Sequence, residues 1–241
     1  MTGSATGSST GSSTGRLELV PGPLGDLTAP AAEGLVAALD RLAAEEPRAL
    51  LVLAPQGVGA EEPRPATPTG LRDPATVLAA FPAPTVAYWN GPAVGAGAEV
   101  LLAADLRVAG PDALLAFPEV GRGELPCWGA TQRLPRLAGI AAALRLLVAG
   151  EPFGVDDLVR CGLAERADDV TAAEELADRL SRGAPRAQAA ARDAVQRGRD
   201  LTMHDALRLE ADLNLLVATT ADRAEGIAAF LEKRDPTFTG E

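Results

Sequence analysis

Two glutamates stand at positions where carboxylates could carry out acid and base chemistry. Glu99 follows three closely spaced glycines in NGPAVGAGAEVLLAADLRVAG, residues 90–110, and Glu119 follows a proline in FPEVGRGELPCWG, residues 117–129. Two carboxylates that converge on one cleft could share a bound water, one taking a proton and the other returning one. The spacing in the sequence does not show whether the two side chains converge.

The glycines before Glu99 predict a tight backbone turn. Gly91, Gly95 and Gly97 follow a predicted strand and precede an apolar helix. Glycine permits a positive φ and close approach of a ligand, and the first turn of a helix offers N–H groups that lack partners. Such a turn could bind an oxyanion, or it could be purely structural. The segment matches neither G-x-G-x-x-G nor a phosphate loop, which argues against a nucleotide site.

A third carboxylate belongs to the same loop. Glu124 lies five residues after Glu119, with Arg122 between them. Its side chain could act as an additional acid, or it could form a salt bridge with Arg122 or Arg133. The sequence favours neither interpretation.

Composition excludes several classes of function. The chain has 241 residues, 47% of them apolar, which suits one domain with a substantial core. A net charge of −11 argues against general binding to nucleic acid. Two cysteines, Cys127 and Cys161, are too few for a disulfide framework and predict a protein of the reducing cytoplasm.

Metal and membrane sites are not expected. No cluster of Cys, His and carboxylates has metal-ligand spacing, and the single histidine, His204, stands near the predicted start of a helix. Thr202 and Asp205 flank it as a capping box, which predicts a surface position. The chain shows neither a signal-peptide pattern nor an apolar run long enough to span a bilayer.

Alternation of strands and helices predicts an α/β fold with a helical C-terminal part. Apolar runs predict strands at 17–20, 49–54, 85–90, 106–110 and 113–117. Helical patterns occupy 28–45, 73–80, 141–149, 172–182, 187–197, 203–217 and 222–233, besides the helix after the glycine turn. Three regions follow: a disordered Gly/Ser/Thr tail at 1–15, a core at 16–183 and a helical region at 184–241.

Taken together and in order, the motifs resemble the crotonase, or enoyl-CoA hydratase/isomerase, superfamily. The resemblance runs through residues 85–110, 117–139, 143–167, 184–195 and 223–240. It implies a spiral of strand-strand-helix turns with a C-terminal trimerisation region. It also implies that the chain forms a homotrimer or a dimer of trimers.

The resemblance implies chemistry on an acyl-CoA thioester, whose enolate is held by two backbone N–H groups. Ala96 would supply one N–H, and Val58, in the segment GVGAEEP, would supply the other. Glu99 and Glu119 fill the two positions where hydratases of this family hold the water that adds across a C2–C3 double bond. The implied activity is that of an enoyl-CoA hydratase, with no metal and no cofactor other than the CoA of the substrate.

The remaining site residues are carried over in the same way. The substrate pocket would be lined by Gly95, Gly97, Pro126, Cys127 and Trp128. CoA would be bound by Gly59, Ala60 and Lys233, the only lysine of the chain.

Two other functions compete with the hydratase. An enoyl-CoA isomerase or a specialised acyl-CoA lyase would use Glu119 or Glu124 as a single proton shuttle. A catalytically weak acyl-CoA-binding or auxiliary homologue would bind the thioester without efficient turnover. The loop at Val58 and the segment from Glu61 to Phe81 are shorter than is usual in the family, and this motivates the auxiliary alternative.

Overall fold

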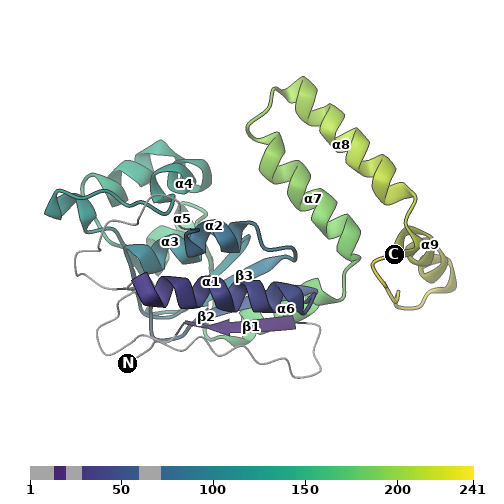
Figure 1. Ribbon diagram of the computed structural model, residues 1–241, viewed down its shortest axis with the longest axis horizontal. Helices are drawn as coiled ribbons and strands as arrows, with labels where there is room; N and C mark the ends of the chain where they lie inside the picture. Colours follow the sequence, from purple (N-terminus) through teal and green to yellow (C-terminus); the bar gives the residue numbers. More distant parts are fainter. Residues whose placement is uncertain (1–13, 20–28, 60–71) are drawn as a thin grey trace.

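The computed structural model of the protein describes residues 14–19, 29–59 and 72–241. Most of the predicted tail, the predicted CoA contact Ala60 and most of the loop that follows it lie outside these ranges. The described residues form two small β-sheets and their covering helices, with a helical C-terminal arm that extends to one side (Figure 1).

A five-stranded parallel sheet carries the core. Its order is β1-β2-β3-β5-β8, and its strands are β1 (Thr14–Glu18), β2 (Ala49–Ala54), β3 (Thr85–Trp89), β5 (Leu106–Ala109) and β8 (Glu165–Arg166). Every residue of β2 and β3 is buried. Continuous apolar runs of this kind are typical of parallel strands that are covered on both faces.

The two faces of this sheet are covered by different helices. Alternate residues of β2 and β3, such as Leu50 and Ala87, belong to one large core cluster with Leu35 and Leu39 of α1 (Ala29–Ala44). The intervening residues, such as Leu51, form a second cluster with α6 (Thr171–Ser181). The two-residue period of a strand therefore divides its side chains between two helical layers.

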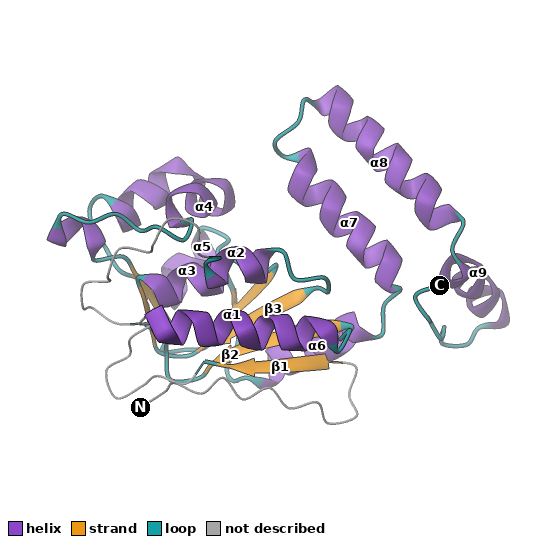
Figure 2. Ribbon diagram, in the orientation of Figure 1, coloured by secondary structure: helices purple, strands orange, loops and turns teal. Residues whose placement is uncertain are grey.

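A second, three-stranded sheet lies beside the first. It consists of β4 (Pro92–Val94), β6 (Leu114–Ala116) and β7 (Phe153–Gly154), in that order. β4 directly follows β3 and β6 directly follows β5, so the chain makes successive strand-strand-helix turns between the sheets. Figure 2 shows helices and strands together, with α1 lying along the strands of the larger sheet. This arrangement confirms the predicted α/β spiral.

The remaining helices complete the fold. They are α2 (Pro74–Ala79), α3 (Ala96–Leu102), the 3₁₀ helix η1 (Glu119–Arg122), α4 (Ala130–Leu147), α5 (Val155–Arg160), α7 (Pro185–Gly198), α8 (Met203–Ala218) and α9 (Ala221–Glu232). In the arm, α7 and α8 run side by side away from the sheets, and neither has a buried residue (Figure 1). His204 is exposed beside the predicted cap, where Thr202 Oγ1 accepts the Asp205 N–H at 3.2 Å.

Two elements start three or more residues away from the predicted position, and the prediction lacked α5, η1 and the short strands β4, β7 and β8. β1 begins at Thr14, so Thr14 and Gly15 belong to a strand and not to the tail, because their backbones pair with β2 whatever their side chains are. α4 begins at Ala130, eleven residues before the expected start at 141, and continues across a kink at Gly139. Pro135 and Gly139 interrupt the helical pattern in the sequence, so the first half of α4 could not be predicted from periodicity.

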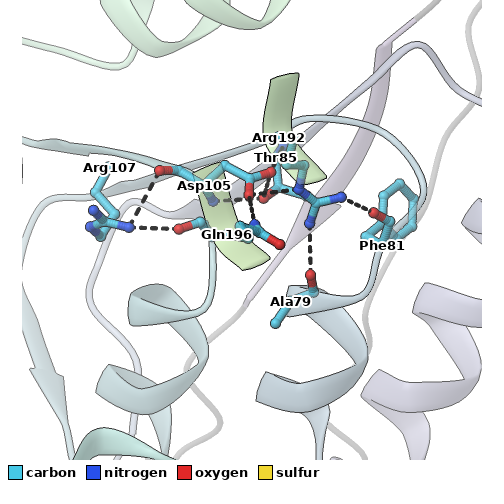
Figure 3. A network of polar contacts seen from close by, with 8 residues as sticks. Ala79, Phe81, Thr85, Asp105, Arg107, Arg192 and Gln196 are labelled. Atoms are coloured by element: carbon cyan, nitrogen blue, oxygen red, sulfur yellow. Dashed lines mark hydrogen bonds and ion pairs between the residues drawn. The ribbon is translucent and has the colours of Figure 1, made fainter. Parts of the chain in front are cut away.

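A buried ion pair attaches the arm to the core. Asp105 accepts the Thr85 N–H at 2.9 Å and the Arg192 Nε–H of α7 at 2.8 Å, and Gln196 donates to it as well (Figure 3). Arg192 also donates to the carbonyls of Ala79 and Phe81 at the end of α2 (Figure 3). Only 16–17% of each charged side chain of the pair is exposed. One carboxylate thus joins β3, the start of β5 and α7.

Replacement of Asp105 by alanine should destabilise the protein by about 3 kcal/mol, because it leaves the buried Arg192 cation without its partner. Asp193→Ala is the matched control, since Asp193 pairs with Arg197 on the exposed face of the same helix. That change should cost less than about 0.5 kcal/mol. Urea unfolding measures both. Equal stabilities of the two variants would show that the Asp105 pair does not anchor the arm.

Candidate active site

The two candidate acids follow the carboxyl ends of two adjacent parallel strands, so they lie at the same edge of the sheet. β4 and β6 pair in the register Val94 with Ala116, and the Gly95 N–H continues the pairing by donating to Ala116 O at 3.0 Å. Glu99 lies in the first turn of α3, just after β4, and Glu119 opens η1, just after β6. The carboxyl ends of parallel strands are where α/β folds build ligand sites.

Both carboxylates are buried, so neither is the solvated surface acid that its local sequence also allowed. Glu99 is 0% exposed and Glu119 is 4% exposed. Carboxylates are almost never buried to this degree unless they are paired or hydrogen-bonded. Burial of two acids beyond paired strand ends is therefore the strongest sign of a functional site in the fold.

Backbone N–H groups hold the Glu99 carboxylate. Its Oε1 accepts the N–H of Trp128 at 2.8 Å and the N–H of Ala130 at 3.0 Å. Hydrogen bonds of this kind offset the cost of burying a polar side chain. They also join the backbone of residues 128–130 to the first turn of α3.

The glycine turn before Glu99 is packed against the Val58 segment. A Cβ on Gly97 would lie 2.6 Å from Val58 O, and one on Gly59 would lie 2.0 Å from Val94 O. Gly59 also has a φ of +90°, in the left-handed region that favours glycine. Both positions must be glycine for the backbone of the Val58 segment to pack against the backbone of the turn. The glycine turn that the sequence predicted therefore packs against the Val58 segment.

One predicted donor must be corrected. Val58 forms a parallel β-bridge with Ala93, in which the Val58 N–H donates to Pro92 O at 2.8 Å and Val58 O accepts the Val94 N–H at 2.9 Å. The Val58 N–H is therefore already engaged and is not the first oxyanion donor. The other predicted donor, Ala96, is the first residue of α3, where helix geometry provides no intrahelical acceptor for its N–H.

The loop after η1 brings one of the predicted pocket residues, Trp128, next to Glu99. Trp128 contacts it directly and is 4% exposed, and Pro126 is also buried, whereas Cys127 is exposed. Glu124 pairs with Arg122, with 3.4 Å between Oε2 and Nε. Of the two salt-bridge partners considered for Glu124, the structure therefore shows Arg122.

Lys233 is not brought near the acids within one chain. It caps α9 at a φ of +57° and is exposed, and α9 lies at the opposite end of the molecule from α3 (Figure 1). A contact between Lys233 and a ligand at Glu99 would therefore have to come from another copy of the chain.

Sequence reasoning missed the role of Arg133. This half-buried residue of α4 donates from Nη1 to Trp128 O and from Nη2 to Ala75 O of α2, at 3.5 Å. Burial lowers the pKa of its guanidinium, against the opposing attraction of the Asp73 and Glu99 carboxylates. Arginine nonetheless stays charged in proteins, so a cation stands beside the Glu99 loop.

Neither a metal cluster nor a membrane-spanning helix is present among the residues that the structure describes. No three side chains among the described His, Cys, Asp and Glu residues gather in a way that could hold a metal ion. None of the described helices has the length and apolarity needed to cross a bilayer.

Comparison with known proteins identifies the family that this geometry resembles. The family model described as enoyl-CoA hydratase/isomerase matches residues 61–241. The 2,3-dehydroadipyl-CoA hydratase of Escherichia coli K12 is 38% identical over 68% of this chain and 66% of its own length. The mitochondrial enoyl-CoA hydratase domain-containing protein 2 of Bos taurus is 39% identical over 71% of this chain and 60% of its own length. The chain thus spans slightly less than two thirds of these relatives.

Solved structures match the whole fold. The enoyl-CoA hydratase of Bacillus anthracis superposes with a TM-score of 0.86 at 27% identity, over 98% of this chain and 99% of that one. Subunit I of the Geobacillus kaustophilus enzyme superposes with a TM-score of 0.84 at 28% identity, over 98% of both chains.

Alanine at Gly97 should destabilise the protein by about 2 kcal/mol, because its Cβ would press on the Val58 backbone and not on a flexible side chain. Gly34→Ala is the control. Gly34 is an exposed residue of α1, and a Cβ added there would have no neighbour within 4 Å, so this change should stabilise by about 0.5 kcal/mol. Denaturant unfolding compares them. A Gly97→Ala protein as stable as wild type would contradict the close packing of the turn.

Proposed function

The chain belongs to the enoyl-CoA hydratase/isomerase family, and from this premise we propose that it adds water across the C2–C3 double bond of a trans-2-enoyl-CoA. The observation that carries the proposal is the pair of buried carboxylates, Glu99 and Glu119, beyond the ends of the paired strands β4 and β6. The names of the relatives, all hydratases of CoA thioesters or their homologues, agree with this reaction.

In this mechanism the thioester oxygen gains negative charge as water attacks C3, so the site needs preorganised donors. We assign one donor to the N–H of Ala96. The second comes from the residues that follow Val58, namely Gly59 or Ala60, since the Val58 N–H is bound to Pro92 O. Donors of this kind stabilise an oxyanion by several kcal/mol, about 3 kcal/mol each by general precedent. The substrate brings its own CoA, and no further cofactor enters the proposal.

The two glutamates divide the proton transfers. Glu99, held by two N–H groups at one oxygen, is oriented to bind the water and accept its proton. Glu119 binds the same water from the neighbouring strand end and gives a proton to C2 as C3 gains the hydroxyl group. The proton that Glu99 took from the water then replaces the one that Glu119 gave. Pro126 and Trp128 then form the pocket wall next to Glu99.

Binding of CoA is proposed to need a second copy of the chain. The arm exposes large apolar side chains, among them Leu215 and Leu216 of α8 and Phe230 of α9, which a homotrimer or a dimer of trimers would cover. Lys233, at the end of α9, would then reach the CoA phosphates of a neighbouring subunit.

We place the protein in the cytoplasm because its two cysteines are free.

Two other functions can be distinguished from the hydratase by experiment. An isomerase or lyase would work with Glu119 or Glu124 alone, and an auxiliary protein would bind acyl-CoA without turnover. The Arg122–Glu124 pair favours a structural role for Glu124. Burial of both Glu99 and Glu119 favours a mechanism that uses two acids.

Wild-type protein should hydrate crotonyl-CoA, measured as loss of the enoyl absorbance. Glu99→Gln and Glu119→Gln should each lower kcat at least about 100-fold, because each removes one proton-transfer group from the shared water. Glu151→Gln is the control, because Glu151 is an exposed residue that pairs with Arg145 and is distant in sequence from Glu99 and Glu119. This variant should keep wild-type activity.

Each alternative has its own result in the same assay. Full activity in both Gln variants would reject the site. Loss of activity in Glu124→Gln with retention in Glu99→Gln would support a single-acid enzyme. Binding of crotonyl-CoA without turnover would support the auxiliary function.

The Lys233→Asn variant should raise KM for crotonyl-CoA about tenfold with kcat unchanged, because it removes a cation proposed to bind phosphate. Asparagine tolerates the left-handed φ of +57° at this position, so the cap of α9 is kept. Steady-state kinetics, with the oligomeric mass as a control, make the test. An unchanged KM in an intact oligomer would remove Lys233 from the CoA site.

A further inference from the structure

We propose that Arg133 is a positioning residue for Glu99, which it serves by fixing the peptide unit between the two N–H groups that hold the carboxylate. The inference rests on the proposed function for its catalytic consequence, but its geometry stands on the described contacts alone. The hydrogen bonds that the Arg133 side chain donates go to backbone carbonyls, so it acts on Glu99 through the backbone of residues 128–130.

Three consecutive peptide units make up this device. The first donates the Trp128 N–H to Glu99 Oε1 at 2.8 Å, and the third donates the Ala130 N–H to the same oxygen at 3.0 Å. The second, between them, accepts Arg133 Nη1 at the Trp128 carbonyl. Rotation of this middle peptide would turn at least one of the two N–H groups away from Glu99, so a bond to its carbonyl restrains both.

Gly129 makes room for this arrangement. Its φ of +105° turns the chain into α4, and a Cβ at this position would lie 2.4 Å from Arg133 Nη1. The guanidinium therefore occupies the space that any other residue's side chain would fill. The Arg133 N–H also donates to Gly129 O at 2.8 Å, so the arginine grips the turn from both its backbone and its side chain.

The guanidinium is itself held in place. Its Nη2 donates to Ala75 O in α2, which anchors the fork on a second element. Burial lowers the pKa of Arg133, while the attraction of the Asp73 and Glu99 carboxylates opposes this larger effect and favours its positive charge. A lysine at this position could keep the positive charge, but it has no rigid planar group that donates hydrogen bonds in two directions. Arg133 provides both the charge and the two bonds.

Kinetics with crotonyl-CoA test the positioning role. Arg133→Gln should lower kcat about 10- to 100-fold with KM changed less than about threefold, because a slightly misplaced base slows proton transfer more than it weakens binding. Arg133→Lys should recover part of the loss. Arg136→Gln is the matched control: Arg136 lies on the same helix and donates to a backbone carbonyl, that of Gln132, but makes no contact with residues 128–130 among its described bonds.

Amide hydrogen exchange gives a readout that does not depend on activity. Arg133→Gln should speed exchange at the Trp128 and Ala130 amides at least about tenfold relative to Arg136→Gln, with exchange in β2 and β3 unchanged. If wild-type protein fails to hydrate crotonyl-CoA but this change in exchange is seen, the proposed function fails and the positioning of Glu99 stands.

Three results would overturn the inference. The first is unchanged exchange at Trp128 and Ala130 in the Arg133→Gln protein. The second is a loss of activity that appears wholly in KM, which would assign Arg133 to substrate binding. The third is a loss that Arg133→Lys does not relieve at all, which would assign Arg133 to general stability.

Discussion

The bonds from Trp128 and Ala130 to the Glu99 carboxylate are the interaction on which the rest of the site depends. Residues 128 and 130 come from the loop before α4 and its first residue, and Glu99 comes from the first turn of α3. A carboxylate with no exposed surface would be costly without such donors. The same bonds that make burial tolerable also set the direction of the carboxyl group and the path of the loop around it.

The fold brings that carboxylate and Glu119 to one edge. The chain passes twice from the large parallel sheet to the small one, and each passage ends in a short strand followed by an acid. Close contact of Gly59 and Gly97 with opposing backbones draws the Val58 segment against the turn. At a distance from the acids, the Asp105–Arg192 pair attaches the arm, which is proposed to complete the CoA site in an oligomer.

Much of the fold could be predicted because it depends on local patterns. The fully apolar run at 49–54 and the run at 85–89, apolar after Thr85, became the central strands, and the helices of the arm ended within two residues of the expected positions. Partners in three dimensions could not be predicted in the same way. The bond of the Val58 N–H to Pro92 O depends on register, and the donors to Glu99 lie 29 and 31 residues away. Arg133 gave no sequence signal beyond Gly129 four residues before it.

A crystal structure of the wild-type protein with butyryl-CoA, a saturated analogue that cannot be hydrated, would show whether Glu99 and Glu119 share a water. We expect one ordered water within hydrogen-bond distance of both Glu99 and Glu119, next to C3 of the acyl chain, with the thioester oxygen at the Ala96 N–H. A thioester bound elsewhere, or two carboxylates that share no water, would contradict this expectation.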